Sequence, residues 1–382
     1  MRRGAKILLV CVLAGSFLTG CWDRRDLENR TSVIAIAIDR NEEIPELVDV
    51  TIQIPIPIKI VGAGGGGSTG EGGQDAVKVL SGSGRTLNEA VQNIQKRLNQ
   101  QLFYGHTRVI VMSETVAETD ISNLIDVVRR SPQVRRLQWP IVVQGRASKI
   151  LEVDPKLEQI PMMFIKEMIE SGTRQGTIPD ISLGEMFIAL SDTSVQPLLN
   201  YIKLTDHGVR WAGAAVFLGS KMVGKMTEPH VWALMNLREA KRGGDVLVPC
   251  PDDPTRFMTF HPRNVSTKVK IEHHGQIHAT YHVRVEGDIQ ESECNLDFNN
   301  EAVINRVQAA TQKVLEQRAN GMIDFLQNNV RSDVLGLGFQ VRAHHPEIWR
   351  QVDWDKEFPT VRIDVKYHVN LRRFGMSMGK PR

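Results

Sequence analysis

The first twenty residues constrain this chain most, because they separate an export signal from the part that folds. Arg2, Arg3 and Lys6 precede an apolar run over residues 7–18, and small residues follow it. A positive, then an apolar, then a small-residue segment is typical of a secretory signal peptide. As a helix the apolar run would span about 18 Å, well short of the roughly 30 Å hydrocarbon core of a bilayer. The pattern therefore predicts a removable signal peptide over residues 1–20.

Cys21 follows this segment directly, in the sequence Leu18-Thr19-Gly20-Cys21. The order resembles a bacterial lipobox, in which the cysteine thiol receives a diacylglyceryl group before the signal is removed. Each buried methylene contributes about 0.8 kcal/mol, and two acyl chains anchor a protein stably where one does not. We therefore expect Cys21 to be the lipidated N-terminus of a membrane-anchored mature protein.

The charge balance of the mature chain excludes one class of function. Removal of residues 1–20 deletes three basic residues and no acidic ones, so 47 basic residues become 44, against 44 acidic residues. A formally neutral chain is not expected to bind nucleic acid or another polyanion through its overall charge. No other apolar run approaches eighteen residues, so the body is expected to be soluble.

Only two cysteines remain in the body once the signal and the lipidated residue are set aside. They are Cys250 and Cys294, which lie in different segments. The sequence favours two free, partly buried thiols over a disulfide, because nothing in the spacing supports a pairing.

The apolar periodicity of the mature chain predicts a mixture of strands and helices. Strands are expected over residues 33–38, 47–60, 76–80, 108–112, 141–143, 209–218, 222–226, 268–271, 277–285 and 361–369. Helices are expected over residues 87–102, 121–130, 160–171, 182–191, 230–240 and 301–330. Thr86 with Glu89, and Ser182 with Glu185, have the spacing of capping boxes. The glycine-rich residues 62–73 are expected to be disordered.

Hairpins interrupt the loose alternation of strand and helix, which favours an α+β fold over a doubly wound sheet. Mixed or antiparallel sheets, each covered by helices, are expected in three domains. We place an N-terminal α+β domain over residues 21–203, a small middle α+β domain over residues 204–258, and a C-terminal α+β domain with a long helix over residues 259–382.

Three patterns that could carry chemistry fail in their sequence context. Residues 66–70 match G-x-S-x-G, but glycines precede them where a nucleophile elbow needs an apolar strand. His274, His278 and His282 would share a helix face, yet their apolar neighbours alternate as in a strand. There His278 and His282 would lie about 13 Å apart, too far for one zinc ion. His106, alone between a helix and a strand, is expected to be structural. We predict no catalytic residue, no cofactor and no metal.

Several short stretches, taken together, have the pattern of a known family. They are Cys21 to Leu27, Tyr104 to His106 with Val109 to Val111, Arg129 to Arg135, Ser182 to Glu185, Gly213 to Phe217, Asp333 to Gly338, and Pro346 to Trp349. In order and over nearly the whole mature chain, they resemble the C subunits of spore nutrient germinant receptors, the GerC-type spore germination lipoproteins. Asp26, Glu28 and Gln133 depart mildly from the residues commoner in that family.

The resemblance implies a non-enzymatic protein with three α+β domains on the outer face of the spore inner membrane. It implies assembly with two polytopic membrane subunits into a receptor that triggers germination. Trp22, Arg24 and Arg25 lie next to the membrane in a segment with three charges of each sign over residues 23–30. This balance offers no net attraction to anionic lipid and suits pairing with a protein. Trp22, Arg24 and Arg25 are therefore candidates for contact with a partner, and a solvated tether is the alternative.

Two other classes of protein remain as alternatives. A lipid-anchored solute-binding protein of an importer would show regular βαβ units in two similar lobes around a ligand cleft. The predicted hairpins near residues 219 and 274 disfavour that arrangement. An anchored hydrolase would need a convergent polar site, which the sequence does not provide.

Overall fold

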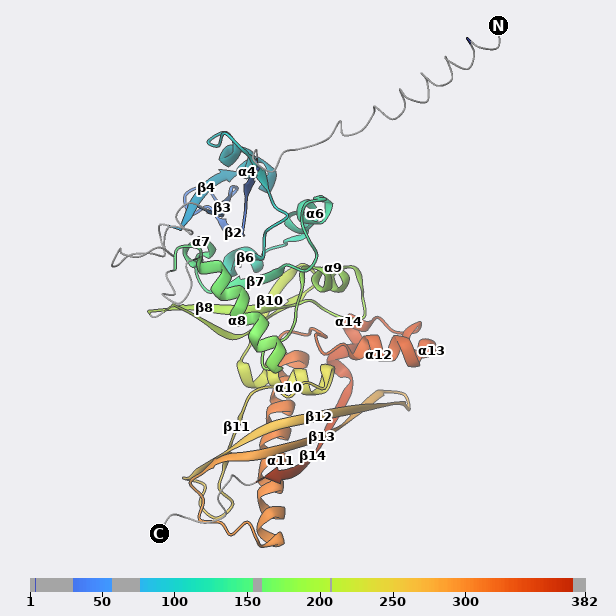
Figure 1. Ribbon diagram of the computed structural model, residues 1–382. Coiled ribbons are helices and arrows are strands. Elements are labelled where there is room, and N and C mark those ends of the chain that lie inside the picture. The colour runs from blue at the N-terminus through green and yellow to red at the C-terminus, as the bar shows by residue number, and fades with distance from the viewer. Residues whose placement is uncertain (1–3, 5–29, 57–75, 154–159, 207, 374–382) are drawn as a thin grey trace, which may run out of the picture.

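The computed structural model describes residue 4 and residues 30–56, 76–153, 160–206 and 208–373 (Figure 1). Among the helices it describes, none is both long and apolar enough to cross a bilayer. The expectations for Cys21 and residues 22–25, and for the glycine-rich residues 62–73, lie outside these ranges. They therefore stay predictions.

An eight-stranded sheet forms the larger part of the molecule. Its strands are β2 (Ala35–Arg40), β3 (Val48–Pro55), β4 (Val77–Gly84), β6 (Val109–Ser113), β7 (Trp139–Val143), β8 (Leu198–Thr205), β9 (Gly208–Leu218) and β10 (Lys221–Met226). The order is β10-β9-β8-β7-β6-β2-β3-β4. The central strands β8, β7, β6 and β2 are parallel, and the outer strands on both sides pair antiparallel. A separate parallel pair consists of β1 (Arg30–Ser32) and β5 (Gln101–Phe103).

Helices connect the strands of this sheet. They are α4 (Leu87–Gln95), α5 (Glu114–Ala117), α6 (Ser122–Arg130), α7 (Ala147–Ile150), α8 (Pro161–Gln175) and α9 (Leu183–Ser191). The capping box at the start of α9 is confirmed, since Ser182 accepts from the Glu185 N–H and Glu185 accepts from the Ser182 N–H. At the start of α4 only half of the predicted capping box forms. Thr86 accepts from the Glu89 N–H, but the Glu89 carboxylate accepts from the Arg85 N–H instead of from the Thr86 N–H. Helix α4 also ends earlier than its apolar pattern suggested.

A four-stranded sheet makes up the C-terminal part. It consists of β11 (Val246–Pro249), β12 (Phe257–His273), β13 (Ile277–Ser292) and β14 (Arg362–Arg373), in that order. Strands β13 and β14 are parallel and the other pairs antiparallel. Alternate residues of β13, from Ile277 to Val285, are buried. The long helix α11 (Glu301–Asp324) packs beside β14 and ends in a π-helical turn, η2 (Phe325–Asn329).

Short helices lie between the two sheets. They are α10 (Glu228–Glu239), α12 (Leu337–His344), α13 (Pro346–Trp349), α14 (Trp354–Glu357) and the 3₁₀ turn η3 (Phe358–Thr360). The molecule is elongated, with β3 and β4 at one end and β12 to β14 toward the other (Figure 1).

The α+β prediction is confirmed, and the two sheets differ in size and topology. This arrangement does not have the two similar lobes of a solute-binding protein. The boundary expected between residues 203 and 204 falls inside β8, whose sheet continues through β9 and β10. The division into three domains stays a prediction.

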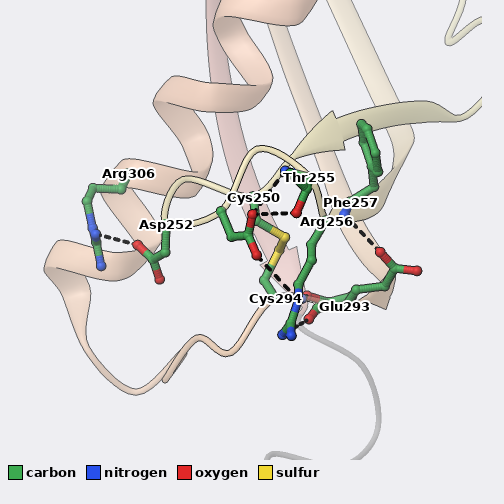
Figure 2. The surroundings of a disulfide bond; sticks show 10 residues. Cys250, Asp252, Thr255, Arg256, Phe257, Glu293, Cys294 and Arg306 are labelled. Carbon is green, nitrogen blue, oxygen red and sulfur yellow. Dashed lines mark hydrogen bonds and ion pairs between the residues drawn. A yellow bond between two sulfur atoms is a disulfide. The ribbon is translucent and has the colours of Figure 1, made fainter.

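The prediction of two free thiols was wrong, because Cys250 and Cys294 form a disulfide with their Cα atoms 5.6 Å apart (Figure 2). Strands β11 and β13 flank β12, and Val248 and Ser292 both lie opposite Met258. Each cysteine lies two residues after the residue that is opposite Met258, and therefore lies just beyond the start of β12. The sheet register brings together two residues that are 44 positions apart in the sequence.

Charged residues surround this disulfide. Arg306 on α11 pairs with Asp252 at 2.7 Å, and a Glu293 carboxylate oxygen accepts from the Phe257 N–H (Figure 2). The loop that contains Cys250 and Asp252 is thus tied to the long helix by the ion pair and to the end of β13 by the disulfide.

Candidate protein-interaction site

Asp333 is the centre of a buried junction between the two sheets. Its Oδ1 accepts from the N–H groups of Gly336 and Leu337, at 2.8 and 3.2 Å. Its Oδ2 accepts from Gly338 N–H at 2.7 Å and from the indole Nε1 of Trp354 at 2.8 Å. Burial raises the pKa of the Asp333 carboxyl, and the four donors oppose that rise. All four contacts require an acceptor, which a carboxylate provides.

The same segment is hydrogen bonded to the eight-stranded sheet. Ser332 Oγ donates to the Phe217 carbonyl at 2.6 Å, and Gln196 N–H donates to the Asp333 carbonyl at 3.0 Å. A Cβ on Gly338 would lie 2.4 Å from Trp354 Nε1, so only glycine allows this close approach. The junction therefore connects β9 to the helices α12 and α14 through buried contacts.

Beside the junction, α6, α9 and α12 lie along one flank of the molecule (Figure 1). On helix α6, Leu124, Ile125 and Val128 are half-buried against the core, whereas Val127 is 42% exposed. On α9, Ile188 is 63% exposed, and Leu137, next to the start of α9, is 83% exposed. An amphipathic helix normally buries its apolar face. The exposed apolar side chains on this flank therefore lack the cover that a core would give them.

A pocket of about 410 Å³ lies in this flank. Its lining combines cationic and apolar side chains from α6, α9 and α12. The lining residues are Arg129, Arg136, Phe187, Ile188, Ser191, Asp192, Thr193 and Arg342. We call this pocket, together with Phe339, the flank site. Phe339 is half exposed, and its ring centre lies 5.6 Å from the Arg342 guanidinium carbon.

A bidentate ion pair fixes one wall of the flank site. Both terminal nitrogens of Arg342 lie 2.7 Å from the carboxylate oxygens of Asp192. Burial alone would raise the pKa of Asp192, but hydrogen bonds from Arg342 and Ser194 outweigh it and hold the pKa below its usual value. Paired arginine–carboxylate geometry of this kind is rigid. The aromatic, aliphatic and arginine groups around it therefore have defined positions.

The histidines considered from the sequence do not converge on a site. His278 and His282 both lie on β13, as predicted, and His278 pairs with Asp364 at 2.8 Å. His106 is exposed, with its ring centre 5.5 Å from that of Phe103. Within the described residues, no group of three or more His, Cys, Asp and Glu side chains could hold a metal ion.

Sequence reasoning missed most of the flank site. Arg129 was noted only as part of a family-like stretch. Asp192 and Arg342 are 150 residues apart and have no shared motif. The resemblance to a known family did contain a signal. Three of the segments that carry it, Ser182 to Glu185, Gly213 to Phe217 and Asp333 to Gly338, lie at the flank site or at the adjacent junction.

The two dissimilar sheets define an α+β protein, and similarity to known proteins identifies its family. The model of the spore germination protein N-terminal domain matches residues 23–204, and the spore germination B3/GerAC-like C-terminal model matches residues 212–375. The chain belongs to the GerC-type family of spore germinant-receptor subunits. This membership supports a role in spore germination.

Individual relatives match over nearly their full lengths. Putative spore germination protein YfkR of Bacillus subtilis (strain 168) is 24% identical, covering 95% of this chain and 92% of that protein. Spore germination protein KC of the same organism is 23% identical, covering 98% of this chain and 97% of that protein. The crystal structure of the GerBC protein shares the fold, with a TM-score of 0.60 at 17% identity, over 88% of this chain and 96% of that one.

Proposed function

We propose that this protein is a non-enzymatic, lipid-anchored subunit of a spore nutrient germinant receptor. Cys21 would hold it to the outer face of the spore inner membrane, where it assembles with two polytopic subunits and supports their signalling. The observation that carries the proposal is the flank site, because a family member with an uncovered apolar and arginine-rich surface has the means to bind another subunit.

The composition of the flank site supports this assignment. Protein interfaces are enriched in aromatic residues and arginine, and their energetic centres combine large side chains in pockets. Phe187, Phe339 and Arg342 supply these groups, and Ile188 supplies an exposed aliphatic side chain. A partner side chain that enters the pocket would be desolvated between these groups, and the Arg342–Asp192 pair would fix its surroundings.

A second contact is proposed close to the membrane. Trp22 has an apolar ring with a polar N–H, which suits the headgroup region. Arg24 and Arg25 belong to the charge-balanced segment described above, which suits pairing with protein more than with lipid. Reversal of Arg24 and Arg25 to Glu is expected to weaken association with the polytopic subunits while lipidation and folding persist.

The flank site can be tested with one substitution and a matched control. Ile188→Asp places a charge in the pocket, whereas Ile44→Asp makes the same change at a 49% exposed isoleucine in the turn between β2 and β3. Neither side chain is buried, so both variants should fold. Each variant would be purified from spore membranes, and the co-purifying polytopic subunits would be quantified by mass spectrometry.

We expect Ile188→Asp to lower the recovery of the polytopic subunits at least about tenfold, the effect of losing one interface centre. Ile44→Asp should recover them at the wild-type level. Wild-type recovery with Ile188→Asp would exclude the flank site as the assembly surface. Equal losses with both variants would show that exposed charge disturbs the protein in general.

A further inference from the structure

The C-terminal sheet has one face that its helices leave open. Along β13 the residues from Ile277 to Val285 alternate between buried and outward-facing positions, and β14 alternates in the same way. The outward positions of the three long strands are mostly polar. A groove of about 660 Å³ crosses them, and β12, β13 and β14 all contribute to its lining.

The sheet register gathers positive side chains in this groove. Lys268, His282 and Lys366 lie directly opposite one another on β12, β13 and β14. In the next outward row, Arg284 lies opposite His368. Neighbouring strands are about 4.8 Å apart and alternate residues about 6.7 Å apart. All five side chains are exposed, and they lie within a patch of about 10 by 7 Å. We call these five residues the cationic row.

The cationic row differs from the charges around it. Outside the row, Lys270 pairs with Glu272, Arg362 with Asp364, and Arg372 with Glu286, at 2.8, 3.2 and 3.7 Å. Within the described residues, none of the five side chains of the row has an ion pair within 4 Å. Glu286 also lines the groove, but its ion-pair partner is Arg372, so these acidic side chains pair with cations outside the row.

Like charges that gather on one face of a sheet repel one another. Lys268 and Lys366 lie on either side of His282, about 10 Å apart, and Arg284 lies in the next row. A face that only met solvent would gain from an acid at any of these positions. The unpaired row therefore indicates that negative charge comes from outside the described chain.

We propose that the cationic row is a docking surface for an acidic polypeptide segment of a partner protein. The groove is open and crosses three strands, which suits an extended segment better than an enclosed small molecule. Several carboxylates spaced along a peptide could each reach a different cation. Such complementarity fixes which partner binds and in which register.

Two candidate ligands of the cationic row come from the protein itself, and both have the wrong charge to bind it. Residues 374–382 follow β14 and contain Lys380 and Arg382 but no acid. A second copy of the protein would bring the same positive row against the first.

A membrane is not the expected ligand of the cationic row, because the row lies far from the lipid that we propose for Cys21. The nine residues from Cys21 to Asn29 reach at most about 30 Å, and they hold the N-terminal part near the membrane. The cationic row lies on the sheet toward the other end of the elongated molecule (Figure 1).

Two full-length variants test the proposal. The row variant carries Lys268→Gln, Arg284→Gln and Lys366→Gln. The control variant carries Lys78→Gln, Lys149→Gln and Lys313→Gln, which removes the same charge from exposed positions on β4, α7 and α11. Binding of fluorescent octaglutamate and of phosphatidylglycerol vesicles would be measured at low and high salt. In spore membranes, carbodiimide would couple lysine amines to carboxylates in contact with them.

We expect octaglutamate to bind the wild type in a salt-dependent manner, at least tenfold more tightly than the row variant and within twofold of the control. Cross-links from Lys268 or Lys366 should reach acidic residues of an identified receptor protein. Equal octaglutamate binding by all three proteins would overturn the proposal. Loss of vesicle binding alone in the row variant would assign the row to lipid instead. Because octaglutamate binding does not require receptor assembly, failure of the Ile188→Asp experiment would leave this result interpretable.

Discussion

Replacing Asp333 by asparagine keeps the shape of the side chain and removes one of its two acceptor oxygens. In the structure each oxygen accepts two hydrogen bonds, and all four donors are N–H groups. The asparagine amide has one oxygen, so its NH₂ group must face two donors in either orientation. If the oxygen keeps the Gly336 and Leu337 contacts, the N–H groups of Gly338 and Trp354 lose their acceptor.

The size of the effect follows from these two donors. A buried donor without a partner costs about 1–3 kcal/mol, so two cost about 2–6 kcal/mol. Relief from burying the carboxylate charge offsets part of this, because burial raises the pKa of Asp333. We expect Asp333→Asn to lower the free energy of unfolding by about 2–3 kcal/mol, a large part of the 5–15 kcal/mol that is typical of a folded protein.

Urea unfolding followed by circular dichroism would measure this loss in a double-mutant cycle. Trp354→Phe removes one of the two stranded donors, so Asp333→Asn should cost at least about 1 kcal/mol less in that background. Equal costs in both backgrounds would refute the idea that the indole depends on Asp333. A cost below about 0.5 kcal/mol for Asp333→Asn alone would show that the junction does not need a carboxylate.

Three further predictions concern other parts of the chain. Replacing Cys250 and Cys294 by serine opens a 44-residue loop, and chain entropy predicts a loss of about 4 kcal/mol in urea unfolding; a loss below about 1 kcal/mol would contradict that account. Cys21→Ala should leave an unprocessed or released protein, and detergent-phase partitioning equal to the wild type would exclude lipidation at this residue. Burial raises the pKa of Glu239, so stability falls as pH rises through the folded-state pKa. Glu239→Gln should therefore unfold at a higher temperature than the wild type at pH 7 but not at acid pH, and an equal gain at both would point to packing instead of ionisation.

Local periodicity predicted most of the elements correctly. The alternation from Val361 to Val369 became β14, the turn at Gly219 joined β9 to β10, and the Ser182–Glu185 pair began α9. Each of these signals depends on residues that are close in the sequence. The parallel pairing of β2, β6, β7 and β8 was not predicted, because crossover connections leave no local mark of which strands become neighbours.

The surfaces were harder to predict than the elements. On α6, Leu124, Ile125 and Val128 pack half-buried against the core, whereas Val127 on the same helix is exposed, and the sequence does not distinguish the two. The neutral net charge also concealed the cationic row, because the register of three strands is what places Lys268 and Lys366 on either side of His282. The sequence could therefore indicate apolar and charged faces but not which of them stayed uncovered.

The bond between Cys250 and Cys294 ties the folding of the C-terminal sheet to a cellular compartment. Disulfides persist in oxidising surroundings outside the cytosol and are rare inside it. A chain retained on the cytosolic side would keep both thiols reduced, and its edge strand β11 would lose its covalent link to β13. Thiol labelling of this pair in sporulating cells would therefore show which molecules have crossed the membrane, without any readout of germination.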